Sequence, residues 1–312
     1  MSDVKIATRD SYGQTLVELG AEYPELVVLD ADLAGATKTG MFKKAYPDRF
    51  FDCGIAEGNM MGIAAGLATV GKIPFASSFA MFATGRAYEQ VRNSIGYPKL
   101  NVKIAASHAG ITVGEDGATH QCLEDIALMR EIPGMVVMVP SDDIEAKAAI
   151  RAAVKHHGPV YIRLGRAACG IVNDYEGYKF EMGKGNTLRE GKDVTIVTTG
   201  VCVEQSLKAA ELLKNEGIDA EVINICTIKP IDEELLIKSA KKTGKVVTVE
   251  EHSVIGGLGS AVCDVLSEKC PTLVKKVGVY DVFGESGSAS ALMTKYGLDA
   301  DGIYQSVKSF LA

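Results

Sequence analysis

The chain has 312 residues and a formal net charge of −7, and 47% of its residues are hydrophobic. This length is enough for two domains, and the scattered Lys and Arg residues argue against a nucleic-acid or membrane surface. No apolar run is long enough to cross a bilayer, and the first residues, MSDVKIATRD, lack the apolar core of a signal peptide. Seven cysteines form no CxxC motif, so we expect free thiols, no zinc site and a reducing, cytoplasmic location.

Apolar runs alternate with helix-like patterns through the first half of the chain. Strands are predicted at 26–30, 50–54, 73–79, 101–107, 135–139 and 159–164. Helices are predicted at 9–22, 57–70, 80–96, 122–132 and 142–156, with a further short helix after a loop that begins at 31. Such alternation indicates a mainly parallel sheet with helices on both faces.

The alternation stops after residue 165 and resumes near residue 193. We therefore predict a first domain over 1–172, a linker over 173–192 and a second domain over 193–312. The second domain repeats the pattern, with strands at 194–200, 220–225, 245–251 and 274–280, helices at 202–216, 232–242 and 258–268, and two helical stretches to the end. The predicted fold class is α/β, with two domains that are each a mainly parallel sheet covered by helices on both faces.

Glu57 opens an unusual helix in which Gly58, Gly62 and Gly66 recur at every fourth position. Each Gly costs a helix about 1 kcal/mol relative to Ala, so we expect close packing against this face as compensation. A carboxylate at the start of such a helix would lie in a tight, dry place. It could instead simply complement the helix dipole, and this stretch alone favours that second interpretation.

A loop from His108 to Gln121 contains two of the five His residues of the chain, together with Glu115 and Asp116. It follows a predicted buried strand, and ligands in open α/β sheets bind outside the carboxyl ends of the strands. The spacing matches no metal site. Histidines that bind an oxygenated substrate or move protons fit this loop better.

Three segments, GIAEGNMMGIAAGLA, SSFAMF and SHAGITVGEDGATHQ, together resemble the pyrimidine-binding and C-terminal domains of transketolase. The resemblance covers essentially the whole chain, including ATRDSYGQ, DADL, YIRLGR and FGESGSASALMTKYG, and is nearest to the C-terminal half of a split transketolase. It implies a thiamine diphosphate-dependent transferase of the pentose phosphate pathway. Such an enzyme moves a two-carbon ketol unit from a ketose phosphate to an aldose phosphate.

The resemblance also implies roles for individual residues. Glu57 would hold a proton at the N1′ atom of the coenzyme's aminopyrimidine, and Phe79 and Phe82 would clamp this ring. The position of a third aromatic residue is occupied by Gly85, and Tyr88 could substitute for it. The family's catalytic and substrate contacts correspond here to His108 and His120, to Arg9 and Arg166 with His108 around the phosphate, and to Asp116 at the hydroxyl next to the carbonyl.

Two expected parts are missing from the sequence. The family's loop serine after DADL is replaced by Ala36 or Thr37, and no GDG motif with a downstream Asn is present to hold Mg²⁺ and the diphosphate. The resemblance therefore implies an N-terminal transketolase subunit that carries the diphosphate-binding domain, in an α₂β₂ heterotetramer. The small-residue face that follows Glu57 is a candidate interface for this assembly.

Other interpretations stay open at this point. Deoxyxylulose phosphate synthase and the β subunits of 2-oxo acid dehydrogenases share the architecture, although the synthase normally lacks a His at position 108 and the β subunits lack GEDGxTHQ. A regulatory paralogue without activity is a third possibility, but such a copy would be free to lose Glu57, Asp116 and the two loop histidines. The stretch EEHSVIGGLGS at 250–260 has charged residues at a strand end and Gly residues that open a helix; we expect its role to be structural.

Overall fold

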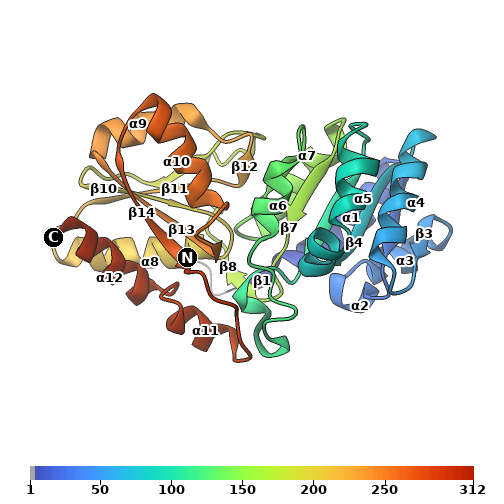
Figure 1. The fold of residues 1–312 in the computed structure, drawn as a ribbon, viewed down its shortest axis with the longest axis horizontal. Coiled ribbons are helices and arrows are strands. Elements are labelled where there is room, and N and C mark those ends of the chain that lie inside the picture. Colours follow the sequence, from blue (N-terminus) through green and yellow to red (C-terminus); the bar gives the residue numbers. More distant parts are fainter. Residues whose placement is uncertain (1–3) are drawn as a thin grey trace.

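The computed structural model describes residues 4–312, and it contains two α/β domains that lie side by side (Figure 1). The first domain is built on a seven-stranded sheet with the order β12-β6-β7-β5-β4-β2-β3. Its strands are β2 (Leu26–Asp30), β3 (Phe50–Asp52), β4 (Ile73–Phe79), β5 (Lys103–Ser107), β6 (Val136–Met138), β7 (Val160–Arg163) and β12 (Thr227–Lys229). All pairings in this sheet are parallel except that of β12 with β6.

Helices cover both faces of this sheet, as the sequence predicted. Residues of α1 (Thr8–Glu22), α3 (Gly40–Ala45) and α7 (Asp143–Lys155) form one core with the sheet. The other face carries α4 (Glu57–Thr69), α6 (Asp125–Glu131) and the helical segment 81–96. Two short elements, α2 (Ala34–Thr37) and η1 (Pro47–Arg49), complete the connections.

The second domain has a five-stranded sheet with the order β14-β13-β10-β11-β9. Its strands are β9 (Asn186–Arg189), β10 (Val194–Thr198), β11 (Ala220–Asn224), β13 (Lys245–Ser253) and β14 (Leu273–Val279). Its helices are α8 (Cys202–Asn215), α9 (Glu233–Thr243), α10 (Leu258–Lys269), α11 (Ala289–Lys295) and α12 (Ala300–Leu311). Helices α8 and α12 pack together on one face, and α9 and α10 pack together on the other.

The predicted strands and helices are confirmed with shifts of a few residues at their ends, but four short strands were not predicted. Strand β9 lies inside the segment 173–192 that we expected to be only a linker, and it pairs antiparallel with β11. Strand β12 follows the second domain's β11 in the chain yet completes the first domain's sheet. Strands β1 (Lys5–Ala7) and β8 (Ala168–Gly170) pair with each other. Each of these strands has only three or four residues, too few to show a hydrophobic period.

The helix predicted at 80–96 is not regular. Two π-helical turns, η2 (Met81–Arg86) and η3 (Val91–Gly96), flank the short helix α5 (Tyr88–Gln90). A π-helical turn holds an extra residue, so it changes which side chains share a face, and such turns are frequent at functional sites. Here the change affects the residues that follow Phe82.

A buried arginine of the first domain, Arg163, contacts the second domain. Arg163 Nε donates to Asp125 Oδ2 at 2.8 Å, and Arg163 Nη2 donates to the carbonyl oxygen of Glu251 in β13 at 2.9 Å. The Tyr161 hydroxyl also donates to Asp125 Oδ2, at 2.6 Å. Burial raises the pKa of the Asp125 carboxyl, but the charges of Arg163 and His252 and the hydrogen bonds from Arg163 and Tyr161 together hold this pKa below its ordinary value. Arg163 is held by its ion pair within the first domain and donates to the second, so its guanidinium links the two domains.

The glycine face of α4 is not closely packed within this chain, contrary to our expectation. A Cβ atom at Gly62 or Gly66 would meet no atom within 4 Å, and neighbouring Ile63 and Val70 are 39% and 71% exposed. Only Gly58 has a close neighbour, the side chain of Gln90. The face is therefore open in the single chain. Among residues 4–312, no helix is both long and apolar enough to span a membrane.

Candidate active site

Glu57 is the first residue of α4, and its side chain is almost completely buried, with 1% exposure. Its carboxylate has one polar partner among residues 4–312, because Arg86 Nη1 donates to Glu57 Oε2 at 2.9 Å. A buried carboxylate is stable only when it is paired or hydrogen-bonded. The carboxylate is thus available to a ligand that can replace the arginine.

The aromatic residues expected to hold the coenzyme lie beside this carboxylate. The rings of Phe79 and Phe82 stack with 5.9 Å between their centroids, and the Arg86 guanidinium lies 4.5 Å from the centre of the Phe82 ring. Tyr88 does not join this group; its side chain packs against the core under α4. Arg86 follows Phe82 by four residues, the spacing that places two side chains on the same face of a helix, whereas Tyr88 follows it by six.

The two histidines of the 108–121 loop meet these aromatic rings. His108 stacks on Phe79 with 3.8 Å between the ring centroids, and His120 contacts Phe82 edge-on at 5.3 Å. His120 Nδ1 lies 2.9 Å from the hydroxyl of Thr119. Residues that are about thirty positions apart in the sequence therefore form one wall, in which the two imidazoles and the two phenyl rings line the same site.

Hydrogen bonds fix the tautomer of His108. Arg9 can only donate, so the 3.2 Å contact between Arg9 Nη1 and His108 Nε2 makes Nε2 the acceptor. His108 Nδ1 then donates to Ser107 Oγ at 2.8 Å. Burial, followed by the charges of Arg9 and Arg166, lowers the pKa of His108 from its ordinary 6.5 to about 3. His108 is consequently neutral, and its backbone has a positive φ of 59°, a strained conformation that is common at functional sites.

Three cationic side chains gather around His108: Arg9, Arg166 and Lys38 all contribute positive charge at its ring. Arg9 Nη1 also donates to the carbonyl of Ala36, but its buried Nε has no partner within the described part of the chain. Arg166 donates to the carbonyl of Val113 and, at 3.0 Å, to Glu115 Oε2. An unpartnered guanidinium N–H next to a second arginine suits a phosphate group.

Asp30, the first residue of DADL, holds the loop that follows it through hydrogen bonds. Its buried carboxylate accepts hydrogen bonds from the backbone N–H of Leu33 and from the hydroxyls of Thr37 and Thr39. Thr37 is therefore engaged within the chain and does not replace the missing family serine. The loop instead presents the Ala36 carbonyl that orients Arg9.

The second domain holds the 108–121 loop in place. Glu251 Oε1 accepts the backbone N–H of Thr112 at 2.6 Å, and a Cβ atom at Gly110 would collide with the same carboxylate. Gln121 Nε2 donates to the carbonyl of Glu285 at 2.9 Å and to two carbonyls of the loop itself. The side chain of Asp116 is exposed and takes no part in these contacts. Because Gly110 has a φ of +77°, a glycine is required at this close approach.

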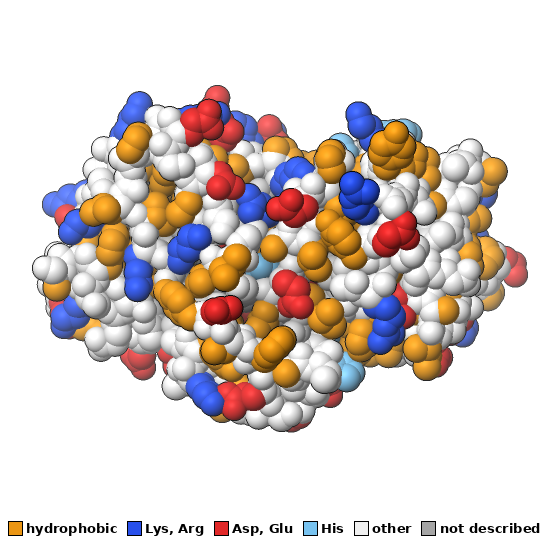
Figure 2. Space-filling view, in the orientation of Figure 1, with side chains coloured by type: hydrophobic (Ala, Val, Ile, Leu, Met, Phe, Trp, Pro, Cys, Tyr) orange, Lys and Arg blue, Asp and Glu red, His pale blue; other side chains and the backbone are white. Residues whose placement is uncertain are grey.

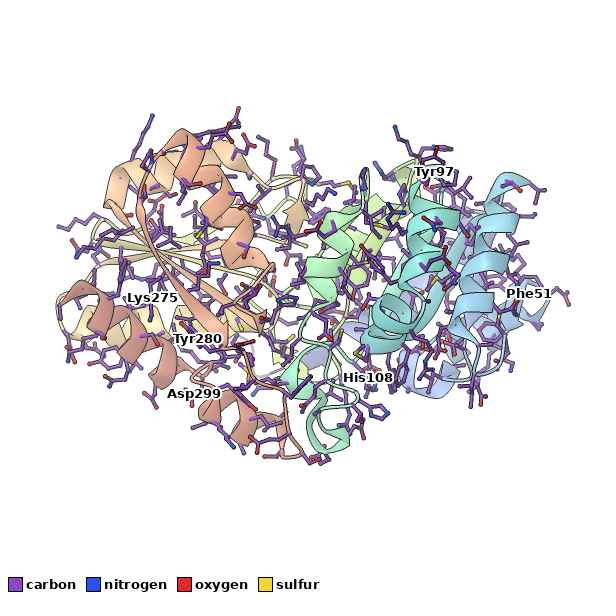
Figure 3. All side chains as sticks on the ribbon, viewed as in Figure 1. Phe51, Tyr97, His108, Lys275, Tyr280 and Asp299 are labelled. Carbon is purple, nitrogen blue, oxygen red and sulfur yellow. The ribbon has the colours of Figure 1, made fainter. Side chains whose placement is uncertain are left out.

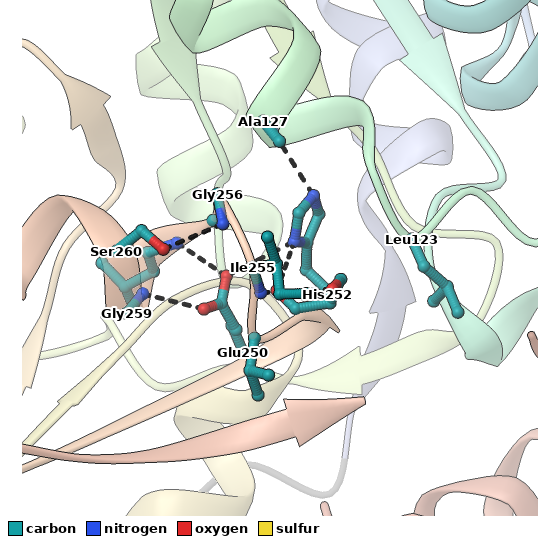
Figure 4. Close-up of polar contacts among 12 residues, drawn as sticks. Leu123, Ala127, Glu250, His252, Ile255, Gly256, Gly259 and Ser260 are labelled. Atoms are coloured by element: carbon teal, nitrogen blue, oxygen red, sulfur yellow. Dashed lines mark hydrogen bonds and ion pairs between the residues drawn. The ribbon is translucent and has the colours of Figure 1, made fainter. Parts of the chain in front are cut away.

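The EEH stretch has the structural role that we expected (Figure 4). Glu250 accepts the N–H groups of Leu258 and Gly259 at the start of α10, so the helix already holds a carboxylate of its own chain. His252 Nδ1 lies 2.7 Å from the Ser253 carbonyl, and its Nε2 faces the N–H of Ala127 in α6. This stretch joins the two domains.

A cavity of about 630 Å³ lies beside the Phe82 ring, between the two domains. Its lining residues are Met81, Phe82, Arg86, Ala118, Thr119, Gln121, Leu123, Glu124, Ser253, Asp281, Val282, Phe283 and Gly284. Figure 3 places His108 where the domains meet, with Tyr280 on the other side of the junction. Hydrophobic side chains gather around this junction in Figure 2, and among the lining residues Phe283 is 87% exposed.

Among residues 4–312, no group of three or more His, Cys, Asp or Glu side chains is arranged to hold a metal ion. The site on this chain thus offers a carboxylate, aromatic faces and cations. These residues fit an aminopyrimidine and an anionic substrate group.

The depressed pKa of His108 predicts an acid-sensitive fold. The unfolded chain binds a proton at His108 below pH 6.5 and the folded chain does not, so stability decreases as the pH falls from 6.5 towards 3. We expect the wild-type chain to lose on the order of 1 kcal/mol more than His108→Gln between pH 6.5 and pH 5. Urea unfolding across this range measures the difference. Exposed His157 supplies the control variant His157→Gln, and equal pH slopes for wild type and His108→Gln would contradict the assignment.

Comparison with known families identifies both domains. Residues 4–170 match the family described as "Transketolase, pyrimidine binding domain", and residues 183–303 match "Transketolase, C-terminal domain". A "Putative transketolase C-terminal section" from Methanocaldococcus jannaschii is 54% identical over 305 residues, covering 97% of this chain and 96% of that protein. The "6-deoxy-6-sulfo-D-fructose transketolase subunit SqwH" from a Clostridium species is 49% identical over 94% of this chain and 90% of its own length.

A solved structure described as "Split gene transketolase, inactive beta4 tetramer" has a TM-score of 0.90 and 56% identity, with 99% of each chain covered. Human transketolase is 38% identical, but the match covers 98% of this chain and only 49% of the human protein. The chain is therefore as long as the separately encoded relatives and about half as long as the fused one. It belongs to the transketolase family, a family of thiamine diphosphate-dependent enzymes, and corresponds to its C-terminal section.

Proposed function

We propose that this chain is the C-terminal subunit of a two-subunit transketolase that transfers a two-carbon ketol unit from a ketose phosphate to an aldose phosphate. The observation that carries this proposal is the convergence of buried Glu57, the Phe79–Phe82 pair and the two loop histidines at one site. Bound thiamine diphosphate would supply a nucleophilic carbon that attacks the substrate carbonyl. Glu57 would hold a proton at the pyrimidine nitrogen, and the phenylalanine rings would orient the pyrimidine plane.

The remaining side chains divide the work on the substrate. Arg9 and Arg166 bind the phosphate, and neutral His108 accepts from Arg9 and thereby fixes its orientation. His120, which is half-buried against Phe82, faces the reacting carbons and moves protons there, whereas Asp116 contacts the hydroxyl next to the carbonyl. His108 binds and orients the substrate and does not act as an acid, because an imidazole with a pKa of about 3 is not protonated at neutral pH.

A partner subunit completes the site. The absence of a metal-binding cluster among residues 4–312 and the open face of α4 both support a second polypeptide that brings Mg²⁺, the diphosphate site and a complementary surface. The 56% identical relative was solved as an inactive tetramer of β chains, which agrees with a subunit that does not work alone. We infer an α₂β₂ assembly with the N-terminal transketolase subunit.

The alternatives differ in their substrates. Relatives of this chain include deoxyxylulose phosphate synthases, of which it covers about half, and subunits named for apulose 4-phosphate and for a sulfonated ketose. His108 beside two arginines favours a ketose that carries a phosphate or another strong anion. A non-catalytic paralogue would have no reason to keep the Glu57 site and the loop histidines together.

A substrate comparison tests the proposed reaction. In the complex with its partner subunit, we expect kcat/KM for xylulose 5-phosphate with ribose 5-phosphate to exceed that for pyruvate with glyceraldehyde 3-phosphate by at least about tenfold. 6-Deoxy-6-sulfo-D-fructose in place of xylulose 5-phosphate reports whether a sulfonate is accepted. Preference for pyruvate would instead identify a synthase and contradict ketol transfer.

A further inference from the structure

Arg86 forms a contact that the coenzyme-binding role of Glu57 does not explain. The Glu57 side chain is 1% exposed and the Arg86 side chain is 53% exposed, so the arginine reaches from the surface to a carboxylate that is otherwise out of water. It is the one polar partner of that carboxylate within residues 4–312. A buried carboxylate without a counter-charge is strongly destabilising, so Arg86 compensates Glu57 in the free chain.

The same guanidinium also covers Phe82, at 4.5 Å from the ring centre. It is a flat group that stacks on an aromatic face and donates an N–H to a carboxylate. An aminopyrimidine clamped by Phe82 and hydrogen-bonded to Glu57 would need these same two contacts. Two flat groups cannot lie on one face of the ring and reach one carboxylate oxygen together.

We propose that Arg86 occupies the place of the coenzyme's pyrimidine in the free chain, and that coenzyme binding displaces it. This inference rests on the proposed function. The exchange keeps Glu57 partnered throughout, because the ring nitrogen replaces the guanidinium as its neighbour. Arg86 therefore acts as an internal competitor that lowers the affinity of the site for thiamine diphosphate.

A cavity beside Arg86 has room for the displaced side chain. Arg86 lies at the end of the π-helical turn η2 and lines the cavity of about 630 Å³ next to Phe82. Within the described residues, its guanidinium pairs only with Glu57 and stacks only on the Phe82 ring. The side chain can therefore rotate into the cavity or into solvent without breaking another hydrogen bond.

Calorimetric titration of the two-subunit complex with thiamine diphosphate and Mg²⁺ tests this competition. An internal competitor weakens the apparent affinity in proportion to the share of molecules whose site it leaves open, and removing it restores the intrinsic affinity. Arg86→Ala should therefore bind the coenzyme about fivefold more tightly than wild type. Arg92→Ala is the matched control, because Arg92 is an exposed arginine of the next π-helical turn that donates to Asn93. Its affinity should equal that of wild type.

Equal or weaker binding by Arg86→Ala would overturn the inference. A wild-type complex that binds no thiamine diphosphate would instead contradict the proposed function, so the two failures are distinguishable.

Urea unfolding of the free chain gives a second readout that needs no coenzyme. Arg86→Ala should lower the unfolding midpoint by more when Glu57 is present than in a Glu57→Gln background, where only a hydrogen bond to a neutral amide is lost. An equal decrease in both backgrounds would contradict the pairing.

Discussion

Replacing Glu57 with glutamine in the two-subunit complex is expected to slow hydrogen–deuterium exchange at the coenzyme's C2 position by at least about 100-fold. Glutamine has the size of glutamate and can still accept a hydrogen bond from Arg86, so the local structure should persist. What it lacks is a carboxyl that can share a proton with the pyrimidine nitrogen. Exchange is followed by NMR of the bound coenzyme, and assembly is followed by analytical ultracentrifugation.

Glu89→Gln is the matched control for this experiment. Glu89 lies on α5 near the same site, but its exposed carboxylate accepts hydrogen bonds from Gln90 and Asn93. We expect wild-type exchange in this variant. Normal C2 exchange in Glu57→Gln would remove Glu57 from its assigned role and leave it as a helix-dipole acid, the interpretation that its own stretch of sequence favours.

The α/β fold could be predicted because its signals are local. Strand β2 is an apolar run that is buried along its whole length, and α7 begins at the N-cap Asp142, which accepts the N–H of Glu145. Strand β12 was missed because its partner β6 lies about ninety residues away in the chain. No local pattern shows that three residues of the second domain complete the sheet of the first.

The site was predicted in its parts but not in its pairings. The resemblance pointed to Glu57, Phe79, Phe82 and the two histidines; in the structure the phenyl and imidazole rings contact one another, and Arg86 links Phe82 to Glu57. It did not point to Arg86, although the four-residue spacing of Phe82 and Arg86 places both side chains on one face of a helix. The role of Tyr88 as a substitute for the third aromatic residue stays a prediction; its side chain packs against the hydrophobic core.

The contacts between the domains could not be predicted from the sequence either. Glu251 is separated from Thr112 by 139 positions, yet it fixes the backbone of the loop that carries both histidines. A signal did exist in Gly110, because a glycine beside a functional His often marks a close approach of another group. The group itself could be identified only in three dimensions.

The largest expected effect is that this chain has no activity without a second subunit. Glu57, the aromatic pair and the arginines that we propose to bind phosphate belong to this chain, but residues 4–312 contain no cluster of side chains that could hold a metal ion. Without that anchor the coenzyme would have only its pyrimidine to bind, at the place that we propose Arg86 occupies in the free chain. The catalytic residues should therefore do no chemistry until the second subunit is present.

A ketol-transfer assay with thiamine diphosphate and Mg²⁺ tests this dependence when it is run on this chain alone, on the diphosphate-binding subunit alone and on an equimolar mixture. We predict no turnover above background from either subunit and full turnover from the mixture. The mixture containing Glu57→Gln serves as the negative control, with Glu89→Gln as the active one. Sustained turnover by this chain in the absence of a second polypeptide would contradict the split site.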